Sequence, residues 1–300
     1  MPNIRTLVKD IYGLFDPKVH IEPKEEHLEL FATNLKNKLR EKLAEVSRPP
    51  TLRMSNLGTP CSRQLWYTVN QPQSGEGLRP NVYLKFLFGD IIEELVLLLA
   101  RVAGHEVVSE QKQLSINGIN GRCDAVIDEI LVDVKSASSR SFDKFEKGLK
   151  KEDDGFGYLT QLGLYNHADG RQGSPAAFLV LDKQNGTLAL DVHKDLDKAS
   201  VLVSLEEKYS DGMTATPAVY RDIEYETLVE ERKAIVAQPE PPPRGFSDVP
   251  EGASGNRKLN VNCSYCPFKH PCWPGVKTYL YARGPVFLTK VVREPNVPQG

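Results

Sequence analysis

Two aspartates and a lysine stand close together in the segment GRCDAVIDEILVDVKSAS, which spans residues 121–138. Because side chains alternate along a β-strand, Asp133 and Lys135 are predicted to face the same side of a sheet. If Asp128 and Glu129 form the loop of a hairpin, Asp124 on the preceding strand lies directly opposite Asp133. The spacing therefore predicts that three charged side chains gather on one face of a sheet.

Carboxylates placed in this way suit metal-assisted chemistry. Directly opposed residues have Cβ atoms roughly 4.5–5.5 Å apart, so two ionised carboxylates repel each other unless a cation lies between them. Oxygen ligands with open positions suit Mg²⁺ or Mn²⁺, which also bind substrate phosphates. Lys135 is suited to hold or deprotonate an attacking water and to offset charge in the transition state. The alternative is that both aspartates flank a turn on a solvated strand face, with Lys135 as their salt-bridge partner.

The elements that position these residues follow from hydrophobic periodicity. Apolar residues at three- and four-residue steps predict an amphipathic helix over residues 25–46 and a more buried helix over residues 82–102. β-rich runs predict a three-stranded antiparallel meander of residues 105–116, 119–127 and 130–135, with a two-residue turn at Asn117-Gly118. Further helices are predicted over residues 141–150, 158–167, 196–209 and 225–236, and strands over 176–181 and 187–192.

Four of the five cysteines form a second constellation. Cys263, Cys266 and Cys272 follow a C-x2-C-x5-C pattern near the carboxyl end, and Cys61 stands far earlier in the chain. Thiols clustered in this way more often hold metal than form disulfides in a reducing compartment. Cys123 has no partner in this pattern and is predicted to be a small buried residue.

The carboxylate and lysine pattern resembles the D…(D/E)-x-K motif of the PD-(D/E)XK nuclease superfamily, and two further motifs resemble its RecB-like branch. Phe88-Gly89-x3-Glu93 is similar to the Gly-x3-His segment of that branch, with Glu93 in place of the metal-binding histidine. Gln161-x3-Tyr165 matches its Gln-x3-Tyr motif. The resemblance implies a restriction-endonuclease-like α/β core with a mixed central sheet flanked by helices. It also implies a metal held by Glu93, Asp124 and Asp133.

The resemblance assigns roles to the remaining motif residues. Gln161 is expected to point toward the catalytic lysine or the backbone, and the ring of Tyr165 toward DNA. One cysteine before the core and three after it resemble the iron-sulfur members of the RecB-like branch, the CRISPR-associated and AddB-type nucleases. This implies a [4Fe-4S] cluster that joins the two ends of the chain. A four-cysteine zinc site is the alternative, in which His270 is a possible substitute ligand.

Arg63 follows Cys61 in a Cys-x-Arg pattern that the same branch shares. It is expected either to contact a DNA phosphate or to be an ordinary surface arginine. Lysines and arginines are also frequent between Lys36 and Arg53, and at the carboxyl end between Lys277 and Arg293. Local DNA contacts and solvated helix faces are both open interpretations of this charge.

Composition limits the remaining possibilities. The 300 residues carry a net charge of -2, with 40% hydrophobic and 26% charged residues, which is typical of a globular protein and excludes one that coats nucleic acid by bulk charge. We read no signal peptide and no membrane span, and expect a cytoplasmic protein. Four segments are predicted: a helical segment 1–60, the nuclease core 61–236, a Pro-rich connector 237–257, and a cysteine segment 258–300 that completes the cluster with Cys61.

These features together predict a metal-dependent DNA exonuclease of recombination, repair or DNA degradation. Its partner is expected to be DNA with a free end, and homo-oligomers or repair proteins are further possible partners. The competing hypothesis is a nuclease-like module that binds DNA ends without cutting. The intact set of Asp124, Asp133 and Lys135 favours the enzyme.

Overall fold

A mixed sheet of five strands forms the centre of the protein, and the computed structural model describes residues 3–44, 50–77, 80–204 and 219–300. The strand order is β1-β4-β5-β6-β7. Their bounds are Val107–Val108, Ala125–Ile127, Ile130–Ala137, Ala176–Asp182 and Leu188–His193. β5 and β6 pair in parallel, and the other neighbours are antiparallel. The expected mixed α/β architecture, with a mixed central sheet and helices, is confirmed.

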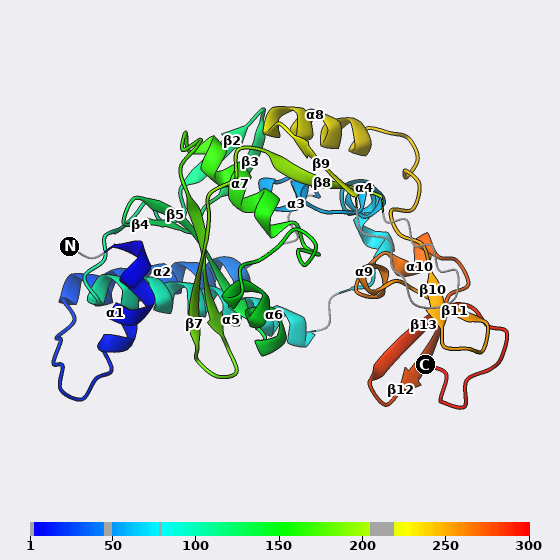
Figure 1. Cartoon of the computed structure of the whole chain (residues 1–300), viewed down its shortest axis with the longest axis horizontal. Helices are drawn as coiled ribbons and strands as arrows, with labels where there is room; N and C mark the ends of the chain where they lie inside the picture. The colour runs from blue at the N-terminus through cyan, green and yellow to red at the C-terminus, as the bar shows by residue number, and fades with distance from the viewer. Residues whose placement is uncertain (1–2, 45–49, 78–79, 205–218) are drawn as a thin grey trace.

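Helices cover the sheet on both faces (Figure 1). α1 (Leu7–Gly13), α2 (Glu25–Leu43) and α5 (Pro80–Val102) lie toward one side, while α3 (Met54–Leu57), α7 (Tyr158–Ala168) and α8 (Tyr225–Val236) lie toward the other. The alternation along β5 explains the two layers, because Val132 and Val134 join the core of α1 and α5. Leu131 and Ala137 join the core of α7 and α8. Asp133 and Lys135, which alternate with the valines, therefore face α7.

The remaining short elements complete the two layers. Single 3-10 turns cover Ile4–Thr6 and Pro72–Ser74. α4 (Ser62–Asn70) packs against α8, and α6 (Ser139–Glu146) packs on β5, β6 and β7 through Phe142 and Phe145. α6 and α7 together form the crossover that joins the parallel strands β5 and β6, as parallel pairing requires.

Two predicted turns are confirmed, but the meander that they were expected to build is not. Asn117 and Gly118 both have positive φ, and so do Asp128 and Glu129, as type I′ hairpin turns require. The first turn joins β2 (Gln113–Ile116) to β3 (Ile119–Arg122), which form a separate two-stranded sheet. The predicted strand 119–127 is interrupted at residues 123–124, so that its two halves belong to different sheets. The prediction of one continuous meander is therefore wrong.

Three other local predictions need correction. β8 (Ala199–Ser204) pairs with β9 (Val219–Ile223), so the helix predicted over 196–209 is wrong where it is described, and the rest lies outside the described residues. The first turns of α5 are exposed rather than buried, at Tyr83, Phe86 and Phe88. The helix predicted over 25–46 ends at Leu43, although residues 45–49 lie outside the described part of the chain. Strand pairing with β9 explains the first error, because the β-branched residues Val201 and Val203 favour a strand once a partner strand is present.

The carboxyl-terminal residues build a second sheet at the other end of the molecule (Figure 1). Its order is β10-β11-β13-β12, with bounds Val249–Glu251, Asn256–Lys258, Gly284–Lys290 and Lys277–Tyr281. Two short helices, α9 (Val261–Ser264) and α10 (Lys269–Cys272), carry the cysteine motif. The prediction of a connector over 237–257 is wrong for its second half, which is the β10–β11 hairpin. The side chain of Asn256 fastens this hairpin to the chain end through the amides of Val292 and Arg293.

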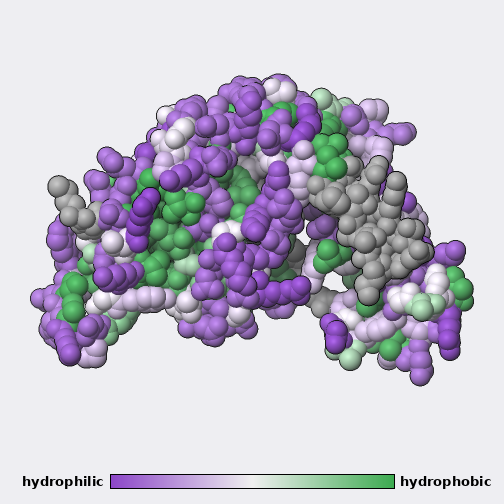
Figure 2. Space-filling view, viewed as in Figure 1, coloured by the Kyte–Doolittle hydropathy of each residue, from purple (hydrophilic) through white to green (hydrophobic). Residues whose placement is uncertain are grey.

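Most of the surface in Figure 2 is hydrophilic, and apolar residues show only in limited patches. No helix of the described residues combines the length and apolar character that a membrane crossing requires.

Candidate active site

The predicted pair on β5 forms as expected. The Lys135 Nζ lies 2.6 Å from the Asp133 Oδ2, and the side chain of Asp133 is only 3% exposed. Burial alone lowers the pKa of Lys135, but the charges of Asp133 and Asp124, together with the hydrogen bond to Asp133, raise it above its usual value overall. The ammonium also lies 4.7 Å from the ring centroid of Tyr158. Lys135 is thus a fixed cation between a carboxylate and an aromatic ring.

Asp124 reaches the same place from just before β4. The register Ala125↔Val132 continues the predicted hairpin, so that the next residues outward are Asp124 and Asp133. The Asp124 Oδ2 accepts a hydrogen bond of 2.7 Å from the backbone N–H of Val134. Burial first, and then the negative charges of Glu93 and Asp133, raise the pKa of Asp124 well above its usual value. Asp124 is thus close enough to Asp133 for the charge of Asp133 to act on it.

Glu93 approaches from α5 and is held by a lysine that the motifs did not reveal. The Lys38 Nζ lies 2.8 Å from carboxylate oxygens of both Glu93 and Glu94. The Gln111 Nε2 donates a further hydrogen bond of 2.5 Å to Glu93. Burial raises the pKa of Glu93 despite the opposing charge of Lys38, and Glu94 and Asp133 raise it further. Glu93 is therefore close enough to Asp133 to feel its charge, but its own partner is Lys38.

Lys38 belongs to a polar stripe of α2 that sequence reasoning missed. Asn34, Lys38 and Lys42 follow each other at four-residue steps and contact Glu110, Glu93 with Glu94, and Asp90 respectively. α2 has no buried residue, so the contacts of Lys38 and Lys42 are prominent in its attachment to α5. A signal was present in the sequence, because this spacing places the three side chains on one helix face. Lys38 is therefore a partner of buried acids and not the exposed phosphate contact that the charge pattern allowed.

Gln161 and Tyr165 also reach the site, but with other partners than expected. The Gln161 Nε2 lies 3.2 Å from both the Asp133 Oδ1 and the Tyr165 hydroxyl. The amide therefore orients the carboxylate rather than the lysine or the backbone. The ring of Tyr165 is 4% exposed and packs in the core, which contradicts the expectation that it faces DNA. Burial, followed by the charges of Asp133 and Asp124, raises its pKa.

Glu93, Asp124 and Asp133 are the kind of oxygen donors that hard cations prefer, but they are not arranged as a closed ligand set. Three carboxylates supply oxygen ligands, and two of them have raised pKa values that a cation would relieve. However, no group of three or more histidine, cysteine, aspartate or glutamate side chains in the described residues is arranged as a metal ligand set. Lys38 and Lys135 neutralise Glu93 and Asp133 instead.

The four motif cysteines line one small cavity, together with Tyr67, Phe268 and Trp273. The cysteines are Cys61, Cys263, Cys266 and Cys272. All of them are free of disulfide bonds. Burial, followed by the nearby thiols, raises the pKa of Cys263 to about 12, and burial raises that of Cys266 to about 11. The chain thus brings Cys61 to the carboxyl-terminal cysteines as the pattern predicts, whereas His270 pairs with Glu76 outside the cavity.

Two arginines fasten the chain around this cysteine cavity. Arg63 donates to the carbonyl of Pro242 at 2.7 Å, so its guanidinium holds the segment before β10. Arg244 donates to the carbonyl of Cys272 and lies 4.0 Å from the ring centroid of Trp273. Cys123 is fully buried in the main core, as predicted. Contact of Arg63 with a phosphate stays a prediction.

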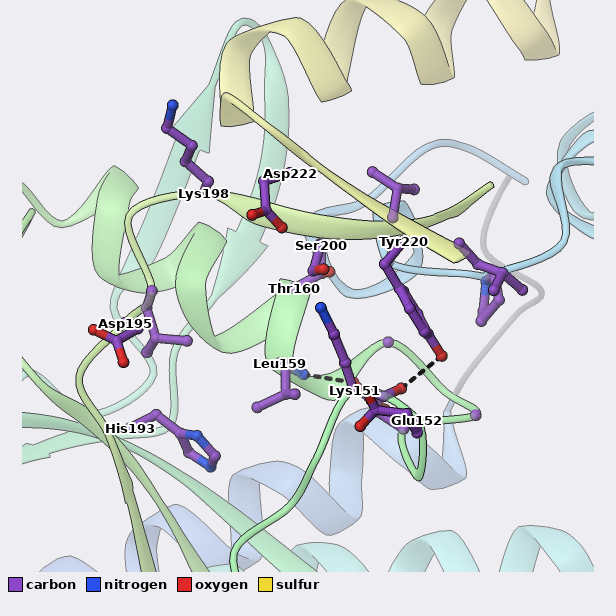
Figure 3. A pocket seen from close by; sticks show the side chains of 18 of the residues that line it. Lys151, Glu152, Leu159, Thr160, His193, Asp195, Lys198, Ser200, Tyr220 and Asp222 are labelled. Atoms are coloured by element: carbon purple, nitrogen blue, oxygen red, sulfur yellow. Dashed lines mark hydrogen bonds between the residues drawn. The ribbon is translucent and has the colours of Figure 1, made fainter. Parts of the chain in front are cut away.

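A second cavity of about 600 Å³ lies between β8, β9 and the loop before α7 (Figure 3). Thr160 lines it, whereas the neighbouring Gln161 belongs to the carboxylate site. Its charged lining is mainly acidic, with Glu152, Asp195 and Asp222 among the residues drawn in Figure 3. Lys151 and Lys198 also line this cavity, but none of the predicted site residues does.

Comparisons with known proteins give distant similarities. No protein-family model and no curated protein matches the chain. A solved structure entitled "Crystal structure of SSO0001" is similar over 81% of this chain and 96% of its own, with 17% identity and a TM-score of 0.40. An alkaline exonuclease from Laribacter hongkongensis is similar over 66% of this chain and 89% of its own, with 16% identity and a TM-score of 0.31. At these scores the function must be argued from the residues of this chain.

Removal of the charge at Asp124 is expected to stabilise the metal-free protein. Because the pKa of Asp124 is raised in the folded state, its contribution to stability is present at low pH and is lost as pH rises through that raised value. In EDTA at pH 8, Asp124→Asn should therefore melt higher than wild type, by about 2–4 °C per kcal/mol gained. The difference should vanish below pH 4, near the ordinary pKa of Asp.

Melting temperatures across this pH range check the expectation. Asp222→Asn, which changes an exposed acid of the other cavity, serves as the control and should show no such pH-dependent gain. A less stable Asp124→Asn at pH 8 contradicts the charge repulsion described here.

Loss of Lys38 is expected to destabilise the fold. Lys38→Met leaves Glu93 and Glu94 buried without their cation, which typically costs about 3–5 kcal/mol. Lys42→Met is the matched control, because Lys42 is more exposed and lies 3.8 Å from its acid, and it should cost less than about 1 kcal/mol. Urea unfolding at pH 7.5 measures the free energy of unfolding of both variants. Equal losses would show that the Lys38 ion pairs contribute no more stability than the Lys42 ion pair.

Proposed function

We propose that this chain is a metal-dependent DNA exonuclease that hydrolyses phosphodiester bonds. The observation that carries the proposal is the convergence of Asp124 and Asp133 beside Lys135, with Glu93 near enough to raise the pKa of Asp124. Three buried acids that share only the two lysines Lys135 and Lys38 are expensive to maintain for stability alone. The same arrangement is useful where a divalent cation and a phosphate must be bound side by side.

The proposed metal ligands are Glu93, Asp124 and Asp133. Bound there, Mg²⁺ or Mn²⁺ supplies a water of lowered pKa and neutralises a phosphate oxygen. Asp124 is oriented by the N–H of Val134 and Asp133 by the amide of Gln161, so their oxygens keep fixed directions. The hydroxyl of Tyr165 orients Gln161 in turn. This chain of hydrogen bonds keeps the carboxylates in place while water attacks the phosphorus.

Lys135 acts in this proposal as a fixed positive charge. Its raised pKa keeps the ammonium protonated at neutral pH, so a role as general base for water is disfavoured. A protonated lysine next to the scissile phosphate stabilises the extra negative charge of the transition state. The leaving 3′ or 5′ oxygen then takes its proton from solvent or from a bound water.

Lys38 connects α2 to this chemistry. It neutralises Glu93 and Glu94 when no divalent cation is bound. A divalent cation held by Glu93 would supply the same compensation, and Lys38 would then remain as the partner of Glu94.

The preference for DNA and for free ends rests on the resemblance of Gly89-x3-Glu93 and Gln161-x3-Tyr165 to RecB-like motifs. One observation favours a second candidate, a module that binds DNA ends without cutting. Glu93 is already neutralised by Lys38, and the described residues contain no closed metal ligand set. The two candidates differ in whether a divalent cation displaces that ion pair.

We further propose that the four cysteines hold a [4Fe-4S] cluster with a structural role. Thiolates are the ligands of such clusters, and a metal deprotonates thiols even where burial has raised their pKa. A single zinc ion is the alternative and needs four sulfurs at about 2.3 Å from one point. The four cysteines line one cavity, and the preference for the iron-sulfur cluster over zinc rests on the resemblance of their spacing to the iron-sulfur members of the RecB-like branch.

The nuclease proposal predicts digestion of end-labelled linear DNA in the presence of Mn²⁺, with circular DNA left intact. Asp133→Asn and Lys135→Met should each lower the rate at least about 100-fold, because each removes a charge that the transition state requires. Asp222→Asn should cut at the wild-type rate. Binding of linear DNA without any cleavage by the wild type would support the non-cutting module instead.

The cluster proposal predicts iron and sulfide in protein that is purified without oxygen, together with broad visible absorbance. Cys61→Ser should lose most of the bound iron and melt at a lower temperature, because the amino- and carboxyl-terminal parts lose their link. Cys123→Ser is the control, since Cys123 lies in the main core and outside the cysteine cavity, and it should keep its iron. A colourless protein with one zinc per chain would identify the alternative metal.

A further inference from the structure

Phe156 is a large aromatic residue that neither the core nor the proposed chemistry uses. It lies in the turn between α6 and α7, and it is 68% exposed. Single exposed apolar residues are common on protein surfaces and need no explanation by themselves. Phe156 differs from them in how firmly its turn is built and in what its ring contacts.

The turn that carries Phe156 is fixed on both sides. Asp154 caps the start of α7, where its carboxylate accepts hydrogen bonds from the N–H groups of Phe156, Tyr158 and Leu159 at 3.3, 2.9 and 2.8 Å. Gly157 has a φ of 76° and packs so closely on Gly58 that an added Cβ would lie 2.1 Å from its carbonyl oxygen. The backbone therefore holds the exposed ring in one place rather than leaving it on a loose loop.

Aromatic contacts connect this ring to Lys135. Phe156 stacks on Tyr158, with ring centroids 5.4 Å apart and an angle of 29° between the planes. The ring of Tyr158 in turn lies 4.7 Å from the Lys135 Nζ. Tyr158 is itself braced by Phe145 and Phe178 of the core. A supported aromatic surface thus runs from the candidate catalytic lysine to solvent.

We infer that Phe156 is a stacking subsite for an unpaired nucleobase next to the scissile phosphate. This inference rests on the proposed function, because it assumes that the scissile phosphate lies at Lys135. Exposed aromatic rings bind single-stranded nucleic acid by stacking on bases, whatever the base sequence. The neighbouring acids Glu152 and Asp153 repel phosphates, so the contact is made through the face of the base.

The subsite selects the form of the DNA near the cut. In a duplex, both faces of an internal base are covered by its neighbours, so Phe156 cannot stack on it. A single strand or a frayed end offers a free base face. Phe156 therefore favours unpaired DNA at the site, and its contribution to affinity is insensitive to salt because stacking releases no counterions.

Binding measurements with inactive protein test the subsite without relying on cleavage. In an Asp133→Asn background, fluorescence anisotropy compares a labelled oligo-dT single strand with a blunt duplex of equal length. Phe156→Ala should weaken binding of the single strand about tenfold, at low and at moderate salt alike, and should leave the duplex nearly unchanged. Phe156→Trp should restore the single-strand affinity. Phe86→Ala, which removes another exposed aromatic ring, is the matched control and should have no effect.

The outcomes separate this inference from the nuclease proposal. Equal weakening for both forms of DNA, or no weakening for the single strand in a variant with an unchanged melting temperature, overturns the stacking subsite. If wild type cleaves linear DNA but Phe156→Ala binds single strands normally, only the subsite fails. If wild type does not cleave, yet single-strand binding depends on Phe156, the nuclease proposal fails, and of this inference only base stacking on Phe156 remains.

Discussion

The candidate site is dominated by one constraint, the electrostatic free energy that is lost when carboxylates lie close together where water is largely excluded. Asp124 precedes β4, Asp133 lies on the central strand β5, and Glu93 lies on α5. Burial and the neighbouring negative charges raise the pKa of Glu93 and Asp124. Lys135 pairs with Asp133 and Lys38 pairs with Glu93, which offsets part of this repulsion. A fold that places three acids in this way gains little stability from them, which points to a function that uses the charge.

Local patterns were sufficient to predict the centre of the site. The two-residue turn at Asp128-Glu129 fixed the hairpin register, and alternation along β5 then put Asp133 and Lys135 on one face. α8 begins and ends at the predicted residues, and α7 differs by one residue. The cysteine spacing also predicted correctly that Cys61 lies with the carboxyl-terminal cysteines. In each case the information is carried by neighbouring residues or by a rare residue type.

Features that depend on contacts between distant segments could not be predicted in the same way. Lys38 and Gln111 reach Glu93 only after α2 and the β1–β2 loop pack near α5, although the four-residue polar spacing of α2 was visible. The burial of Tyr165 depends on the separate β2–β3 hairpin, because Gly121 of β3 packs against its ring. The Pro-rich segment joins a sheet only because partner strands arrive later in the chain. In each of these places, tertiary contacts override the preference of the local sequence.

A crystal structure of the protein with Mn²⁺ locates the ion by anomalous scattering, independently of activity. We expect a manganese peak within about 2.0–2.4 Å of oxygens from Asp124 and Asp133, with Glu93 as a third ligand and the Lys38 ammonium turned toward Glu94. A structure at saturating Mn²⁺ with no peak between these carboxylates, and with the Lys38–Glu93 pair unchanged, would contradict it.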